Sequence, residues 1–238
     1  MHGSGRLVAA WLDLFAGSSC LGCGKAGALL CADCGSELSG MARRVGPSPS
    51  PPGLRPCWAS APYDGLAGEL VLWHKERNAL SLTRPLGLLL AEAAYQLLRN
   101  HPPDPHTEVL LVPVPSRGEV VRSRGHNPVR AICLVAADQL RRLGLPVRVE
   151  PLLRQRFRVL DQSALSAIDR RENLAASMMV NRSAHAALVR RARPVTTVLC
   201  DDILTTGATA REGQRALEDN GLQVRGIATI AFTSRRSQ

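Results

Sequence analysis

The sequence predicts an α/β protein, with a mostly parallel, doubly wound sheet preceded by a small cysteine-rich module. Short apolar runs alternate with helical patterns over most of the 238 residues, an order typical of parallel strands joined by crossover helices. One apolar run, 195–200, ends in the adjacent acids Asp201 and Asp202, and a Thr/Gly-rich turn and a helical pattern follow at once. Four of the seven cysteines fall in two close pairs near the start.

Composition restricts the class of protein. Hydrophobic residues make up 45% and mean hydropathy is −0.04, as in globular proteins. The longest apolar stretches, 7–16 and 86–94, are too short to span a bilayer, and no cleavage pattern precedes Cys20, so we expect no membrane span and a cytoplasmic location. The net charge of +10 attracts phosphates from nucleotides to DNA, although arginine-rich codon usage also explains it. Aromatic residues, at 3%, argue against a base-stacking platform.

Three regions follow along the chain. Residues 1–45 combine a short amphipathic helix, 7–16, with the cysteine pairs. Residues 46–56 are rich in proline, which favours an extended linker and excludes a helix. Residues 57–238 contain the alternating pattern and are predicted to form the α/β domain.

The elements of the third region are bounded by helix-breaking residues. Helices are predicted at 65–76, 82–100, 128–143, 161–177 (after a polar start) and 208–220. Strands are predicted at 109–114, 147–150, 195–200 and 224–232. His101 with two prolines ends one helix, Gly144 and Pro146 end another, and Gly221 is the predicted left-handed cap of a third.

The two acids and the turn after them suit a sugar phosphate. Ligands of open α/β sheets bind beyond the carboxyl ends of strands, and the first N–H groups of a helix attract anions. Groups that would face a phosphate belong to Leu204, Thr205, Thr206, Gly207, Ala208 and Thr209. Asp201 and Asp202 suit ribose hydroxyls or a hydrated Mg²⁺ instead. Helix capping explains one Asp or one Thr of the run, but not all of it.

The cysteine pairs indicate a structural metal. Cys20, Cys23, Cys31 and Cys34 form two C-x-x-C pairs with seven residues between them, which fits tetrahedral Zn²⁺. A redox protein needs only one such pair, and a zinc with four thiolates has no open position for catalysis. The other cysteines, Cys57, Cys133 and Cys200, are expected to be isolated core or linker residues.

The acidic run resembles the 5-phosphoribosyl-1-pyrophosphate (PRPP) motif of type I phosphoribosyltransferases. Further segments resemble the ComF family of phosphoribosyltransferase-like proteins linked to bacterial competence: the cysteine module, His74-Lys75, Val112-Pro-Val-Pro115, Arg124-Gly125-His126-Asn127, and the polar residues from Gln162 to Asn173. The family often has an aromatic residue and a glutamine where this chain has His126 and Pro128.

The resemblance implies a type I phosphoribosyltransferase fold and a set of roles. Asp201 and Asp202 would hold the ribose, and Thr205, Thr206, Gly207, Ala208 and Thr209 would hold the 5-phosphate. Ser116, Arg117, Gly118 and Arg124 would meet the pyrophosphate. Lys75 would reach a pyrophosphate or a ribose, or would only complement the dipole of its helix.

Two classes of function are therefore expected. One is an enzyme or binding protein that takes PRPP or another ribose 5-phosphate compound with Mg²⁺, and whose phosphoribosyl acceptor the residues do not identify. The alternative is a non-catalytic, competence-related protein that handles single-stranded DNA with other DNA-uptake proteins. A third reading, in which the cysteine module docks a partner, rests only on that module and the linker.

Overall fold

A computed structural model of the chain describes residues 19–115, 127–155 and 177–233. The main sheet contains β1 (Arg43–Val45), β2 (Cys57–Pro62), β3 (Glu108–Pro113), β4 (Val147–Val149), β7 (Val195–Leu204) and β8 (Val224–Phe232). A separate pair consists of β5 (Leu153–Gln155) and β6 (Met178–Val180). The helices are α2 (Ala32–Leu38), α3 (Leu66–Glu76), the 3₁₀ helix η1 (Leu80–Leu82), α4 (Thr83–Asn100), α6 (Pro128–Arg142), α8 (Arg182–Arg190) and α9 (Ala208–Glu218).

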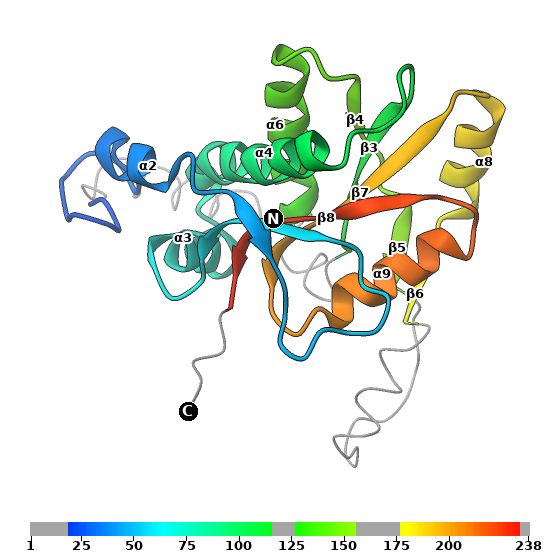
Figure 1. Cartoon of the computed structure of the whole chain (residues 1–238). Helices are drawn as coiled ribbons and strands as arrows, with labels where there is room; N and C mark the ends of the chain where they lie inside the picture. The colour runs from blue at the N-terminus through cyan, green and yellow to red at the C-terminus, as the bar shows by residue number, and fades with distance from the viewer. Residues whose placement is uncertain (1–18, 116–126, 156–176, 234–238) are drawn as a thin grey trace, which may run out of the picture.

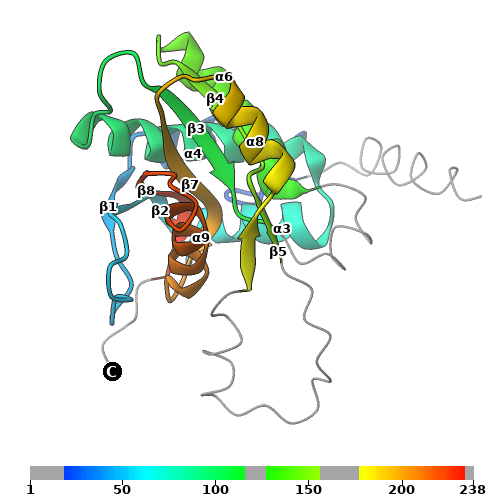
Figure 2. The ribbon, with the colours of Figure 1, turned by 90° about the vertical axis from the view of Figure 1, so that its right-hand side faces the viewer.

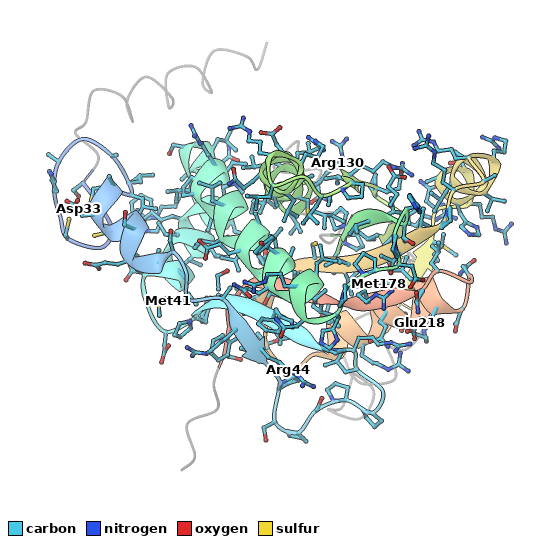
Figure 3. The ribbon with its side chains drawn as sticks, turned by 45° about the horizontal axis from the view of Figure 1, so that its top comes forward. Asp33, Met41, Arg44, Arg130, Met178 and Glu218 are labelled. Atoms are coloured by element: carbon cyan, nitrogen blue, oxygen red, sulfur yellow. The ribbon has the colours of Figure 1, made fainter. Side chains whose placement is uncertain are left out.

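The main sheet is mostly parallel. Its strand order is β1-β2-β8-β7-β3-β4, and every neighbouring pair is parallel except β1 with β2. Helices α4 and α6 lie side by side over one face, and α9 lies on the other (Figures 1 and 3). The predicted α/β class with a mostly parallel sheet is thereby confirmed.

Alternating side chains of the strands build two apolar cores. In β3, Val109 and Leu111 join the cluster that contains α4 and α6, whereas Leu110 and Val112 join the cluster under α9. All four side chains are at most 1% exposed. Burial on both faces explains the continuous apolar run in the sequence, because a parallel strand covered by helices needs no polar side.

Local signals set the helix ends. The Asn127 side chain accepts a hydrogen bond from the N–H of Arg130 at 3.1 Å, and Pro128 occupies the first turn of α6. Gly144 and Gly221, just beyond α6 and α9, have φ values of 83° and 75°, which confirms the left-handed cap predicted for Gly221. None of the described helices is long and apolar enough to cross a membrane.

Several expectations need correction or completion. Strand β7 continues to Leu204 instead of ending at Cys200, because its residues up to Leu204 pair with β8. The acids therefore lie inside the last part of the strand, and Leu204 belongs to the strand and not to the turn. The predicted helix 7–16 and most of the segment 161–177 lie outside the described residues. The sequence analysis also missed β1, β2, β5, β6, α2 and α8.

The proline-rich residues 46–56, expected as a linker, connect β1 to β2 within the sheet. Residues 43–45 pair with residues 57–59, so this segment is the loop of a β-hairpin. It runs beside α9 in both views of the ribbon (Figures 1 and 2). Strand β1, which falls within the predicted N-terminal module, is thus part of the main sheet.

Candidate functional site

The site lies where the order of the strands changes direction. From β3 the chain passes through α6 to β4 on one side, and from β7 it passes through α9 to β8 on the other. Strands β3 and β7 are neighbours, with Pro113 opposite Cys200. Ligands of doubly wound sheets bind at such a switch point, beyond the carboxyl ends of the two strands. The loop after β7 and the chain after β3 both leave the sheet here.

Strand β7 presents the two acids at this edge. Asp201 is half-buried, and Asp202 is only 5% exposed. One carboxylate oxygen of Asp201, Oδ1, accepts a hydrogen bond from the N–H of Asp202 at 2.9 Å. Burial, followed by the neighbouring charge of Asp202, raises the pKa of Asp201 well above its usual range. The two neighbouring acids repel each other when both are charged, and a bound polyol or cation would relieve that repulsion.

Lys75 joins the acidic pair from a distant part of the sequence. It lies in the last turn of α3 and forms an ion pair with Oδ2 of Asp202. Its side chain is 30% exposed, whereas that of Asp202 is 6% exposed. The pairing places one of the two lysines of the chain at the site, a contact that the sequence analysis did not predict.

Residues 205–209, which we call the phosphate loop after the ligand that the sequence predicts for them, follow β7 directly. Gly207 has a φ of 74°, a left-handed conformation that glycine adopts readily, and it precedes the first turn of α9. The N–H of Ala208 lies 3.4 Å from the hydroxyl of Thr206. Within the described residues, no acceptor is found for the N–H groups of Thr205, Thr206, Gly207, Thr209 and Ala210. This row of donors is therefore available to an anion.

The remaining predicted phosphate contacts are not placed. Ser116, Arg117, Gly118 and Arg124 lie outside the described residues, so their roles stay predictions. The chain that leads to them is placed: the N–H of Val114 bonds to the carbonyl of Cys200 at 2.8 Å. The segment after Pro115 thus starts beside β7.

The four predicted metal ligands form one cluster around the start of α2, close to Asp33 in Figure 3. The sulfurs of Cys20, Cys23, Cys31 and Cys34 lie within 4.8 Å of one another. Those of Cys23 and Cys31 are 3.7 Å apart, close to the roughly 3.8 Å between thiolates that share a tetrahedral zinc. The four cysteines are thus close enough to hold one structural metal ion such as zinc.

Backbone groups tune the cluster. N–H groups of Cys31 and Cys23 face the sulfur of Cys20 and lower the pKa of that thiol to about 6. The hydrogen bond with Cys31 and burial raise the pKa of Cys34 instead. Crowded sulfurs cannot all be charged without a counter-ion, which a divalent metal would supply.

The three other cysteines are all buried. Cys57 faces the core under α9, as expected for a core residue. Cys133 and Cys200 are not isolated from each other: burial, followed by the neighbouring thiol of Cys200, raises the pKa of Cys133. A search with protein-family models and a search of curated proteins each find no match to this chain.

Proposed function

We propose that the protein binds PRPP or another ribose 5-phosphate compound with Mg²⁺ beyond the carboxyl ends of β3 and β7. On this proposal it is a phosphoribosyltransferase-like protein of the ComF type, with zinc in its cysteine cluster, and it transfers the phosphoribosyl group to an acceptor. The observation that carries the proposal is the combination of two crowded carboxylates near the end of β7 with a row of N–H groups, in and just after the loop that follows, for which the described residues offer no acceptor.

The parts of the site match the parts of the ligand. The hydroxyls of a ribose would donate to Asp201 and Asp202, and its 5-phosphate would accept from the N–H groups and hydroxyls of Thr205, Thr206, Gly207, Ala208 and Thr209. The distance along the chain between acids and loop is short, as a compact pentose phosphate requires. Ser116, Arg117, Gly118 and Arg124 would contact the pyrophosphate from the β3 side.

Phosphoribosyl transfer requires little covalent catalysis by the protein. The bond between C1 and the pyrophosphate oxygen breaks with positive charge developing on the ring, and the acceptor then bonds to C1 and loses a proton. The protein would hold the ribose and neutralise the leaving group. Lys75, released from Asp202 by the bound ligand, could supply one positive charge to the pyrophosphate.

The acidic pair also fits Mg²⁺. Carboxylate oxygens are the ligands that this ion prefers, and it usually keeps several waters. The charge of the ion would relieve the repulsion that, with burial, raises the pKa of Asp201. Bound there with PRPP, the ion would supply charge neutralisation at the pyrophosphate.

Calorimetry tests the proposal. PRPP with Mg²⁺ is titrated into the wild-type protein and into a variant with Asp201→Asn and Asp202→Asn. We expect saturable binding by the wild type and binding about a hundredfold weaker by the variant, since two charged hydrogen bonds are lost. Asp138→Asn, an exposed acid on α6, is the control. Equal binding by both proteins, or none by the wild type, contradicts the proposal. A screen of PRPP with candidate bases for pyrophosphate release would then identify the acceptor.

A second candidate function is the handling of single-stranded DNA. Nitrogen-bearing side chains project from α8 and the turn after it (Figure 3). Arg182, Arg190, Arg191 and Arg193 are exposed there and form no ion pair within the described residues. If these residues bind DNA, affinity for a single-stranded oligonucleotide must fall steeply with salt, and a flat salt response excludes this candidate.

A further inference from the structure

We propose that the proline-rich loop, residues 46–56, is a strap that holds the phosphate loop in its ligand-binding conformation, and that Gln214 is the positioning residue that fastens it. The inference rests on the proposed function for the identity of the ligand. The strap itself is argued from contacts between residues that stand far apart in the sequence.

The strap lies directly against Gly207. A Cβ atom built on Gly207 would be 2.9 Å from Cγ of Pro47, 3.0 Å from Cδ2 of Leu54 and 3.3 Å from Cδ of Pro51. Gly207 is buried although it lies in a loop. The strap therefore leaves no room behind the phosphate loop, and the backbone of Gly207 cannot move in that direction without displacing it.

Gln214 fastens the strap to α9. Its side-chain amide accepts a hydrogen bond from the N–H of Arg55 at 2.9 Å and donates one to the carbonyl of Gly53 at 2.9 Å. The residue is only 1% exposed. A buried amide with both of its ends bonded to one stretch of backbone fixes both the distance and the direction of that stretch.

Arg211 adds a third attachment one turn earlier on α9. Its Nε donates to the carbonyl of Pro52 at 2.9 Å. Arg211 is also bonded to the phosphate loop, because its N–H donates to the carbonyl of Gly207 at 2.8 Å. The same residue thus contacts the strap with its side chain and the loop with its backbone.

The loop between β1 and β2 is longer and richer in proline than a simple link between two strands needs to be, which favours its role as a strap. Two paired strands need only two to five residues to join them, whereas residues 46–56 extend along α9 (Figure 2). Prolines restrict the backbone before it docks, so less conformational entropy is lost when the strap holds its position. A strap that is rigid in itself can keep the N–H groups of the phosphate loop aligned for an anion.

Hydrogen–deuterium exchange of the full chain tests the strap without a ligand. Gln214→Leu removes, at nearly constant volume, the two hydrogen bonds to the strap and a third that Gln214 donates to Glu218 at 3.1 Å. Gln214→Glu keeps the acceptor for Arg55 but loses the donors to Gly53 and Glu218. Arg55→Ala is the matched control, because it removes the ion pair with Glu218 but leaves the N–H of residue 55 and all three hydrogen bonds of Gln214 in place. We expect the amide of Arg211, whose N–H bonds to the carbonyl of Gly207 in the phosphate loop, to exchange about tenfold faster in Gln214→Leu. It should exchange at least as fast in Gln214→Glu, whose buried carboxylate faces that of Glu218, and at the wild-type rate in Arg55→Ala.

The pattern of exchange separates positioning from general destabilisation. Amides of β3 and β8 should keep their wild-type rates in all three variants, because only the strap is released. Unchanged exchange of the Arg211 amide in Gln214→Leu, or equal acceleration throughout the sheet, overturns the strap.

A titration with ribose 5-phosphate and Mg²⁺ then links the strap to binding. We expect Gln214→Leu to bind about tenfold more weakly than the wild type, and Arg55→Ala to bind equally well. Wild-type affinity in Gln214→Leu overturns the positioning role. A wild-type protein that does not bind the sugar phosphate, but whose loop is released in Gln214→Leu, supports the strap and contradicts the proposed ligand instead.

Discussion

At the scale of single residues, the position of Asp201 disfavours its charged form and so costs folding stability. Burial and the charge of Asp202 disfavour its carboxylate, and the hydrogen bond from the N–H of Asp202 offsets this only in part. The protein nevertheless has an acid at this position, where an amide of the same shape would avoid the conflict. Such a sacrifice of stability is expected where a charge is needed to bind a ligand.

The first prediction concerns this cost. A carboxyl group whose pKa is raised on folding contributes stability that is complete below its unfolded pKa, about 3.9. That contribution is lost as the pH rises through the folded value. Asp201→Asn should therefore make the ligand-free protein more stable than the wild type at pH 7, with little difference below pH 4. Thermal unfolding measured across this range checks it, and Asp138→Asn on the surface of α6 is the control. A variant less stable than the wild type at pH 7 would contradict the prediction.

The second prediction concerns Lys75, which neutralises a carboxylate that is 6% exposed. Lys75→Met keeps the apolar stem but leaves Asp202 without its counter-charge. We expect a loss of about 1–3 kcal/mol of unfolding free energy, less than for a fully buried pair because Lys75 is partly exposed. Adding Asp202→Asn should restore most of this loss, because the unpaired charge is then gone. Chemical unfolding of the two single variants and the double variant measures the coupling. Independent, additive losses would show that the ion pair does not matter.

At the scale of elements, the cysteine module packs against the helix that carries Lys75. A Cβ on Gly22 would lie 2.8 Å from the sulfur of Cys34 and 2.9 Å from Cδ2 of Leu66, the first residue of α3. Leu21, Leu29, Leu30 and Leu38 also pack on the core beneath α4. The module is therefore attached to the α/β domain next to α3, and a change in the metal cluster can reach that helix.

The third prediction follows from this close contact. Gly22→Ala would push the sulfur of Cys34 or the end of α3 aside, so a bound zinc should be lost at about tenfold lower concentration of a competing chelator. Gly35→Ala is the matched control, because its Cβ would make only ordinary contacts of 3.7 Å and 3.8 Å with Leu30. Zinc retained per chain is the measurement. Equal retention by the two variants would contradict the prediction.

At the scale of the whole molecule, the sequence predicts those elements that have a local signature of their own. The unit β7–α9–β8 could be read directly, because an apolar run, a Thr/Gly turn and a capped helix each have a local signature. Helix α8 was missed because it has only nine residues and buries only Leu188, so it offers few core-facing positions from which a helical period can be read. The proline-rich loop was interpreted as a linker because composition does not reveal that it packs on α9.

The candidate site divides in the same way. Its acids and its phosphate loop are continuous in sequence and could be predicted together. Lys75 stands far away along the chain, and only the packing of α3 against the sheet brings it to Asp202. The strap likewise depends on contacts between residues 47–55 and 207–214, which no local pattern encodes. The central residues of the site are thus neighbours in the sequence, and contacts with distant segments complete it.

The most direct test of the central claim is an NMR titration of the ¹⁵N-labelled protein with ribose 5-phosphate and Mg²⁺. If the acidic pair and the phosphate loop together hold the ligand, the amide signals of residues 201–210 should shift and saturate together, and Asp201→Asn should weaken the response. Saturable shifts confined to other parts of the chain, or no shift in this segment at millimolar ligand, would contradict the account.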